Sequence, residues 1–364
     1  MVKDVHPLRV GIVGASPGKS WASRSHIPAI AALDSMTLTA VATSSAETAR
    51  ASAEQFGAKH WFVGIEDMVA CSDVDLVIVA VKVPAHFDLA VAALEAGKHV
   101  YCEWPLGVDT IDAQHIADIA RDSVGRNAIG LQARSSPTLR YMRDLIRSNF
   151  IGDIESASVV AYSSRGADPV TPMKEYLFDS NVGANLLTIE VGHLVDSVAF
   201  VLGEPDSSTT RLDLRRPVLT RSDGSELHPD TPDTFTSIMT TASGAVISVH
   251  LAQGSHSLVT TRISVLGSHG ALQLSTTLPG GVQMSPLELW GADSATSPLR
   301  RLTPPKSYSQ VNQPSVASAV NVAEALHAFG SDIRNGTVTA PTFLDAVARH
   351  QSLDRIMPSR AALR

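Results

Sequence analysis

Three glycines near the start of the sequence have the setting of a phosphate-binding turn. Gly11, Gly14 and Gly18 lie within and after a strand-like run at 8–13 and before a helix-like segment. Glycine lets the backbone approach a pyrophosphate, and the N-terminus of the next helix offers N–H donors. The spacing departs from the G-x-G-x-x-G fingerprint, so a glycine-rich turn without a ligand is the alternative. We predict a dinucleotide site because the turn follows the first strand of a doubly wound pattern.

The second strand-like run ends at Thr43 without the acid that usually binds the ribose hydroxyls of NAD. Ser44 and Ser45 can instead donate hydrogen bonds to a 2'-phosphate, with Arg50 close by in the sequence. This arrangement favours NADP over NAD as the cofactor. The alternative is that Ser44 or Ser45 caps the helix that follows.

In the first third of the chain, apolar runs of strand length alternate with helix-like segments. The strand-like runs are 8–13, 38–43, 76–81, 99–102 and 128–131, and the helix-like segments are about 22–33, 46–56, 85–97 and 111–123. Such alternation is typical of parallel strands joined by crossover helices. We therefore predict an α/β Rossmann domain, a doubly wound parallel sheet, over residues 1–130.

After about residue 150 the pattern changes to consecutive strand-like runs with turns between them. These runs are 155–162, 235–241, 246–251, 260–266 and 271–274. One strong helical pattern, 184–202, interrupts them, and 294–314 is rich in Pro and Ser, as in a loop. Helical patterns return at 317–333 and 342–356, and these helices can pack back on the first domain. We predict an α+β domain over 131–364, with a large, open-faced and mostly antiparallel sheet.

Composition narrows the class of protein. The chain has 364 residues, 44% hydrophobic and 18% charged, which is enough for two globular domains. Its net charge of -7 and the absence of a basic cluster in the sequence argue against nucleic acid or a membrane as the main partner. Cys71 and Cys102 belong to no closely spaced Cys/His set, so we expect no metal site. Strand-sized apolar runs and a charged N-terminal segment predict a cytoplasmic protein.

The motifs from residue 79 on resemble the glucose-fructose oxidoreductase, inositol dehydrogenase and MocA (Gfo/Idh/MocA) family. They are Pro84 with His86, Ala96-Gly97-Lys98-His99-Val100, Glu103-x-Pro105, Leu326-His327-Ala328-Phe329, Ile333-Arg334-Asn335-Gly336 and Pro341-x-Phe343-x-Asp345-Ala346. The resemblance implies a Rossmann domain followed by an open-faced sheet that shapes a substrate pocket. It also implies a homodimer or a homotetramer.

Within this family, the sequence most resembles the branch that includes the yeast galactose-pathway repressor. The supporting residues are Gly18-x-x-Trp21-Ala22, His26-x-Pro28-Ala29, Glu103-Trp104, Gln132-Ala133-Arg134-x-Ser136-Pro137, Asn185-Leu186-Leu187-Thr188-Ile189 and Val191-Gly192-His193-x-x-Asp196. The resemblance implies a bound nicotinamide dinucleotide. Beyond the residues given above, it implies cofactor contacts from Ser16, Trp21, Val81, Val83, Pro84, His86, Glu103, Trp104 and Gln132.

The proton-transfer residues of the family are partly replaced. Trp104 stands where the family has the lysine of Glu-Lys-Pro, and an indole N–H neither accepts nor releases a proton near neutral pH. Ile189 stands where the family has an aspartate. His193 is retained, and its pKa range makes it the expected catalytic acid or base, with a histidine satisfied in the helix core as the alternative.

Other side chains are further candidates around this site. Lys174 and Tyr176 lie on a predicted loop and are substitute proton donors, unless they are loop residues without a chemical role. Glu190 shares a helix face with His193, or is solvated. Trp104 either stacks on the substrate or only fills the space of the lysine.

Three classes of function fit these observations. The first is an NADP- or NAD-dependent oxidoreductase that moves hydride to or from a carbonyl or hydroxyl of a small polar molecule, such as a carbohydrate, with His193 and Trp104 in the pocket. The alternative is a non-catalytic regulator that binds the dinucleotide and a protein partner. A lyase or glycosidase that oxidises a sugar transiently also fits the fold. We favour the oxidoreductase because pocket motifs outnumber signals for a partner.

Overall fold

The chain divides into two compact units. The computed structural model describes residues 6–18, 20–254 and 257–357. The first unit combines the described residues up to Ser135 with Ser309–Ala348, and the second combines Ser136–Tyr308 with the described residues from Arg349 on. The chain therefore leaves the first unit after Ser135 and returns to it at Ser309.

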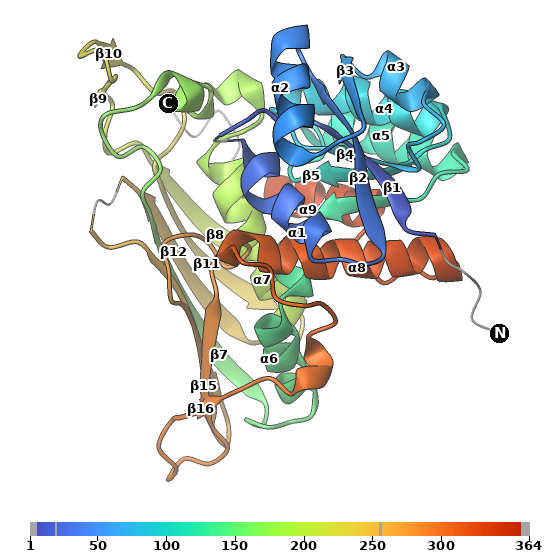
Figure 1. Ribbon diagram of the computed structural model, residues 1–364. Helices are drawn as coiled ribbons and strands as arrows, with labels where there is room; N and C mark the ends of the chain where they lie inside the picture. Colours follow the sequence, from blue (N-terminus) through green and yellow to red (C-terminus); the bar gives the residue numbers. More distant parts are fainter. Residues whose placement is uncertain (1–5, 19, 255–256, 358–364) are drawn as a thin grey trace, which may run out of the picture. The chain divides into compact units, whose positions relative to one another are not determined.

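A parallel six-stranded sheet forms the centre of the first unit (Figure 1). Its strands are β1 (Leu8–Val13), β2 (Met36–Thr43), β3 (His60–Val63), β4 (Leu76–Val79), β5 (His99–Glu103) and β6 (Asn127–Gly130). Their order is β3-β2-β1-β4-β5-β6. In this doubly wound order, ligands bind outside the carboxyl ends of the strands where the order reverses, between β1 and β4. The predicted Rossmann fold is confirmed.

The helices of the first unit come from both parts of the chain. They are the π-helix η1 (Ala22–His26), α1 (Ile27–Ala31), α2 (Ala46–Phe56), α3 (Glu66–Ala70), α4 (His86–Glu95), α5 (Thr110–Asp122), α8 (Val320–Asn335) and the beginning of α9 (Phe343–Ile356). α8 packs against α1 and the core of the sheet. The ring centre of Phe329 on α8 lies 6.4 Å from that of Tyr101 on β5. The late helix is thus part of the first hydrophobic core.

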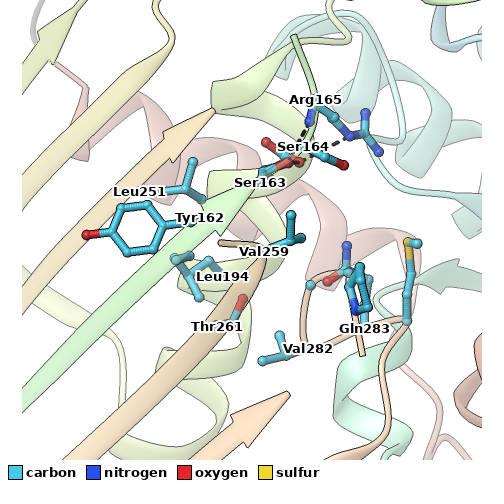
Figure 2. Close-up of a pocket in the computed structure, with 16 residues that line it drawn as sticks. Tyr162, Ser163, Ser164, Arg165, Leu194, Leu251, Val259, Thr261, Val282 and Gln283 are labelled. Carbon is cyan, nitrogen blue, oxygen red and sulfur yellow. Dashed lines mark hydrogen bonds and ion pairs between the residues drawn. The ribbon is translucent and has the colours of Figure 1, made fainter. Parts of the chain in front are cut away.

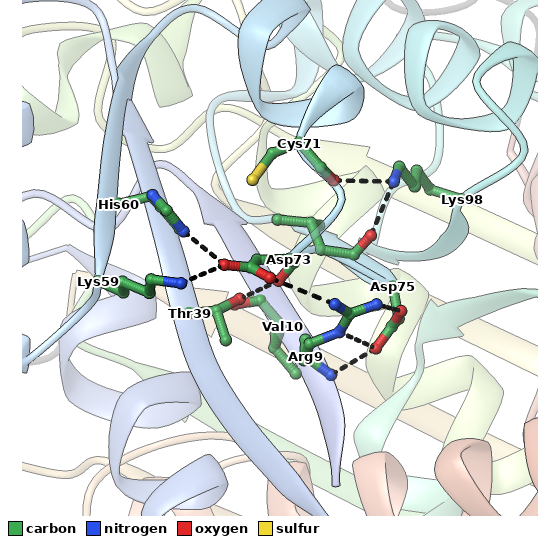
Figure 3. Close-up of polar contacts among 10 residues, drawn as sticks. Arg9, Val10, Thr39, Lys59, His60, Cys71, Asp73, Asp75 and Lys98 are labelled. Carbon is green, nitrogen blue, oxygen red and sulfur yellow. Dashed lines mark hydrogen bonds and ion pairs between the residues drawn. The ribbon is translucent and has the colours of Figure 1, made fainter. Parts of the chain in front are cut away.

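A network of ion pairs lies at the amino ends of the strands, on the opposite side of the sheet from the carboxyl ends (Figure 3). The guanidinium of Arg9 donates two hydrogen bonds to Asp75, at 2.9 and 2.6 Å. Asp73 accepts from Lys59 at 2.6 Å and contacts His60 at 2.9 Å. These two hydrogen bonds lower the pKa of Asp73 to about 2. Since ligands bind at the other edge of such sheets, we interpret this network as structural.

The second unit is built on an eight-stranded sheet. Its strands are β7 (Ile154–Ser163), β8 (Pro205–Asp213), β11 (Thr234–Thr241), β12 (Val246–Gln253), β13 (Thr260–Gly267), β14 (Ala271–Thr276), β15 (Leu287–Ala292) and β16 (Arg300–Leu302). The order is β16-β15-β14-β13-β7-β12-β11-β8, and every pair is antiparallel except β7 with β12. A short hairpin, β9 (Leu219–Thr220) and β10 (Glu226–Leu227), stands apart from this sheet. The predicted mostly antiparallel sheet is confirmed.

Two helices lie against one face of this sheet, α6 (Pro137–Arg147) and α7 (Gly192–Leu202) (Figure 1). Strand alternation creates that face: in β12, Ile247, Val249 and Leu251 are buried, whereas the residues between them are partly exposed. A π-helix, η6 (Leu186–Val191), leads directly into α7. In the described part of the chain, no helix has both the length and the apolar composition to cross a membrane.

Candidate functional site

The predicted phosphate-binding turn lies at the carboxyl end of β1. Gly14 has a φ of 99°, and a Cβ atom there would lie 2.4 Å from the carbonyl oxygen of Ala80, so only glycine fits. Gly18 has a φ of 89°, and no described heavy atom lies within 4 Å of where its Cβ would be. Gly11 instead lies inside β1, where a Cβ would meet the sulfur of Met68 at 2.9 Å. The turn is therefore tight at Gly14 and open at Gly18, whereas Gly11 lies in β1 and packs against Met68.

The predicted ribose end lies at the tip of β2. Ser45 is the N-cap of α2, and its Oγ accepts the backbone N–H of Thr48. The hydroxyl of Thr43 also contacts that of Thr48, at 2.6 Å. Ser44 and Arg50 are exposed, and the Arg50 guanidinium lies 5.2 Å from the centre of an indole ring on β3. Capping thus uses Ser45, whereas Ser44 and Arg50 remain accessible at this edge.

A buried carboxylate ends β5. Glu103, with a side chain 11% exposed, contacts Nε2 of His26 through Oε1 at 2.7 Å. Gln132, at the start of a short 3-10 helix after β6, donates from Nε2 to Oε1 at 3.0 Å and to Oε2 at 2.7 Å. These contacts join η1, β5 and the segment after β6 at the carboxyl edge of the sheet. Sequence motifs far apart in the chain therefore meet at one carboxylate.

Several polar atoms around this carboxylate lack a hydrogen-bond partner among the described residues. They are Oε1 of Gln132, Nδ1 of His26, Nε1 of Trp21 and the hydroxyl of Tyr101, all buried. The rings of Trp21 and His26 meet edge to face, with centres 6.5 Å apart. Buried polar atoms without a partner are rare in proteins and point to a bound group or water. A nicotinamide nucleoside, which has amide and hydroxyl groups, fits such a mixture of donors and acceptors.

The remaining predicted cofactor contacts follow β4 and β5. Val81 precedes the 3-10 helix η2 (Val83–Ala85), which contains the exposed Pro84. His86 is buried and contacts the carbonyl oxygens of Pro105 at 2.8 Å and of Val81 at 3.2 Å. Burial lowers the pKa of His86, and its two ring nitrogens lie between the loops after β4 and β5.

Two more predicted residues lie at the same edge of the sheet. The carbonyl oxygen of Ser16, in the glycine turn, accepts a hydrogen bond from the hydroxyl of Ser20 at 2.8 Å. Trp104, which follows β5, is 4% exposed. Its position in the core of the first unit is compatible with filling the space of the lysine, which is one of the two roles considered for it.

His193 lies in the first turn of α7 and is 6% exposed. Its carbonyl oxygen accepts a hydrogen bond from the hydroxyl of Ser197 at 2.7 Å. One turn further on, Asp196 pairs with Arg349 at 3.1 Å, and both side chains are 1% exposed. Arg349 also pairs with Glu204 at 2.6 Å. Asp196 is thus part of a buried ion pair, a structural arrangement.

A cavity of about 170 Å³ lies within the second unit (Figure 2). Its lining comes from β7 and the residues just after it, from η6 and α7, from β12 and β13, and from the loop 279–284. Glu190 is the acid in this lining, and its carboxylate contacts Ser163, Arg165 and Gln253. The alternative that Glu190 is simply solvated is wrong, since its side chain is only 13% exposed.

The two other predicted proton donors lie on the 3-10 helix η4 (Pro172–Phe178). Lys174 is exposed, and Tyr176 is partly buried. Burial raises the pKa of Tyr176, against the opposing effect of Arg165, so the phenol is protonated near pH 7. Neither residue belongs to the described lining of the cavity.

Some residues of the two clusters were not predicted. Arg165, Ser163 and Gln253 join Glu190 from the ends of β7 and β12, and their polar side chains at strand ends were the available signal. His26 appeared only within a motif, without a role. Its partner, Glu103, is distant in the sequence, so the contact between the two residues could not be predicted without the three-dimensional structure.

Two family models match the chain. One, described as an oxidoreductase family with an NAD-binding Rossmann fold, matches residues 8–130. The other, described as the C-terminal domain of Gal80p, matches residues 137–276. The first match lies within the first unit and the second match within the second unit.

Characterised relatives include a dehydrogenase and a regulator. Dehydrogenase aclE of Aspergillus oryzae is 34% identical over 244 residues, which cover 63% of this chain and 65% of that protein. The galactose/lactose metabolism regulatory protein GAL80 of Kluyveromyces lactis is 30% identical over 213 residues, which cover 56% of this chain and 47% of that protein. The chain therefore matches less than two thirds of the length of either relative.

Among solved structures, levoglucosan dehydrogenase in complex with NADH and levoglucosan is similar with a TM-score of 0.85. The identity is 22%, and the match covers 99% of this chain and 98% of that chain. At this level of identity, the similarity establishes the fold alone.

Proposed function

Because the chain belongs to the Gfo/Idh/MocA family of NAD-binding oxidoreductases, with a second domain like that of Gal80p, we propose that it is a nicotinamide-dinucleotide-dependent oxidoreductase. Its substrate is a small polar molecule with a carbonyl or hydroxyl group, such as a sugar derivative. The observation that carries the proposal is the Glu103 carboxylate, bound by His26 and Gln132 among buried polar atoms without described partners.

Different residues of the chain have different roles in this reaction. The bound nucleotide supplies the hydride chemistry. Gly14 permits the tight turn, Gly18 leaves room for a pyrophosphate, and Glu103 with Gln132 orients the nicotinamide end. His193 holds or releases the proton of the substrate oxygen, because an imidazole can both accept and donate a proton. Trp104 lines the site and carries no proton.

We further propose NADP as the preferred nucleotide. No carboxylate stands at Thr43, Ser44 or Ser45, where NAD-specific folds of this kind place an acid against the ribose hydroxyls. Ser44 and Arg50 are exposed at this edge and offer a hydroxyl and a cation to a 2'-phosphate. An Arg50→Ala variant should weaken NADPH binding more than NADH binding.

A dinucleotide-binding regulator is the second candidate function. It is favoured by the Gal80p-like second domain and by Trp104 in place of the lysine. Such a protein binds the nucleotide but does not turn over a substrate, and it recognises a protein partner.

One experiment separates the two candidates. NADH and NADPH binding is measured by nucleotide fluorescence, and turnover is measured by absorbance at the nicotinamide band with a panel of sugars, keto-sugars and polyols. Binding with turnover supports the oxidoreductase, and binding without turnover across the panel supports the regulator. If neither nucleotide binds at millimolar concentration, both proposals fail.

A further inference from the structure

The cavity of the second unit has the size of a single ring. Its volume is about 170 Å³, and an engineered cavity of about 150 Å³ in another protein holds one benzene molecule. The three strands β7, β12 and β13 contribute to its wall, and the loop 279–284 lines another part. The cavity therefore suits a small molecule with a five- or six-membered ring.

The lining of this cavity combines apolar and polar groups (Figure 2). Its apolar surface comes from residues such as Leu194, Leu251, Val259 and Val282. Its charge comes from Arg165 and Glu190. Pockets of this kind bind small molecules through apolar contact, and a few polar groups select among them. A ring with apolar faces and hydroxyl groups at its edge matches this lining.

Hydrogen bonds fix the Glu190 carboxylate and leave it one free acceptor position. Oε1 accepts from the hydroxyl of Ser163 at 2.6 Å and forms an ion pair with Arg165, whose Nε lies 3.1 Å away. Oε2 accepts from the amide of Gln253 at 2.8 Å. Each carboxylate oxygen has room for about two donors. Among the described contacts, Oε1 is occupied by Ser163 and the Arg165 ion pair, and Oε2 can accept one more hydrogen bond from a ligand.

The charges at this position are unequally buried. Arg165 balances Glu190 overall, but its side chain is 31% exposed and that of Glu190 is 13% exposed. A hydroxyl group that enters can donate to Oε2. A carboxylate that enters meets a like charge where water is scarce, and such a contact is unfavourable. The position of Glu190 therefore discriminates ligands by charge.

We propose that Glu190 is a specificity-determining residue that selects uncharged polyhydroxyl compounds and excludes their carboxylate counterparts. The proposal rests on the proposed function in taking the ligand of this cavity as the substrate. Ile189 occupies the position of the family aspartate, and Glu190, one residue later on η6, supplies a carboxylate to the cavity instead.

The test is calorimetric titration of the full chain with neutral and charged sugars. The neutral probes are D-glucose, D-galactose and myo-inositol, and the charged probes are D-glucuronate and D-galacturonate. The variant is Glu190→Gln, and the matched control is Glu155→Gln, because Glu155 is an exposed residue of β7 outside the cavity lining. An Arg165→Gln variant gives a second and independent readout.

The expected result is a change in selectivity. Wild type should bind a neutral probe at least about tenfold more tightly than its uronate, and E190Q should weaken neutral binding about tenfold and bring the ratio close to one. R165Q should increase the ratio, because the negative charge then lacks its counter-ion. E155Q should change neither affinity.

Three outcomes would overturn the proposal. One is an equal loss of both ligand classes in E190Q, which a purely structural role would produce. The second is a wild-type protein that binds none of the neutral probes, and the third is a wild-type protein that binds neutral and charged probes equally well. Nucleotide fluorescence in the same samples keeps the two proposals apart: selectivity without nucleotide binding rejects the proposed function, and nucleotide binding without selectivity rejects only the role of Glu190.

Discussion

Two glutamates, one in each unit, are held by similar hydrogen bonds in different surroundings. Glu103 and Glu190 each accept from a glutamine amide, and their side chains are 11% and 13% exposed. Glu103 has a buried histidine as its second partner and lies among polar atoms without described partners. Glu190 has an arginine and a serine as partners and lines a cavity. The first carboxylate is suited to orient a buried group, and the second to select a ligand.

Removing the proposed acid or base should show the largest difference between the roles of the two units. We expect His193→Ala to lower kcat by about 10²- to 10⁴-fold, the usual contribution of a general acid or base. Nucleotide affinity should not change, because the proposed nucleotide contacts lie in the first unit. Steady-state kinetics and fluorescence titration measure the two effects, and His228→Ala, at an exposed histidine, is the control. An unchanged kcat would remove His193 from the mechanism.

The buried ion pair of the second unit provides a structural reference for Glu190. Arg349→Ala leaves Asp196 buried without its counter-ion, which should lower the free energy of unfolding by about 3–5 kcal/mol. The exposed pair of Arg301 with Glu288 is the control, and Arg301→Ala should cost at most about 1 kcal/mol. Urea denaturation measures both. Equal effects of the two variants would contradict the structural assignment.

Exchanging the Glu103 carboxylate for an amide should lower the affinity for the nucleotide and leave the affinity for sugars unchanged. Glu103→Gln turns one acceptor of the cluster into a donor that faces other donors, and about tenfold weaker nucleotide binding is expected. The control is Glu54→Gln, at an exposed residue of α2. Sugar affinity should stay constant, the reverse of the expectation for E190Q. A parallel loss of sugar binding would mean that the two glutamates do not have separate roles.

The smallest effect is expected at a carboxylate that belongs to neither site. The pKa of Asp73 is lowered from 3.8 to about 2 by its hydrogen bonds with Lys59 and His60. A lowered folded-state pKa stabilises the protein at pH values above 3.8, and this contribution is lost as the pH falls towards 2. Asp73→Asn should therefore lower Tm at pH 7 and have less effect as the pH falls through this window. A Tm difference that grows on acidification would contradict this.

Much of the fold followed from periodicity, but the helix α6 and the strands β8 and β15 were not predicted, although they have 11, nine and six residues. Other missed elements are short. The predicted strand 8–13 matches β1, and the predicted helix 46–56 matches α2. β3 has only four residues that alternate in burial at the sheet edge, and β16 has three residues inside the predicted loop 294–314. Such segments carry too few residues for a periodic signal.

The sites were only partly predictable because their contacts join distant parts of the chain. Glycines and motifs located Glu103 and His193, but neither the pairing of His26 with Glu103 nor the contact of Arg165 with Glu190 leaves a local pattern. The roles of the individual site residues, the cytoplasmic location and the homodimer or homotetramer stay predictions.

The return of the chain to the first unit determines how the protein can be divided. Phe329 and its neighbours on α8 fill the core beneath β5, although β1 and the glycine turn lie some three hundred residues earlier. A fragment cut after Tyr308 would leave the ring of Tyr101 without this cover. The first unit is therefore not a detachable N-terminal module, and a minimal version would have to join the segment ending at Ser135 directly to the one beginning at Ser309.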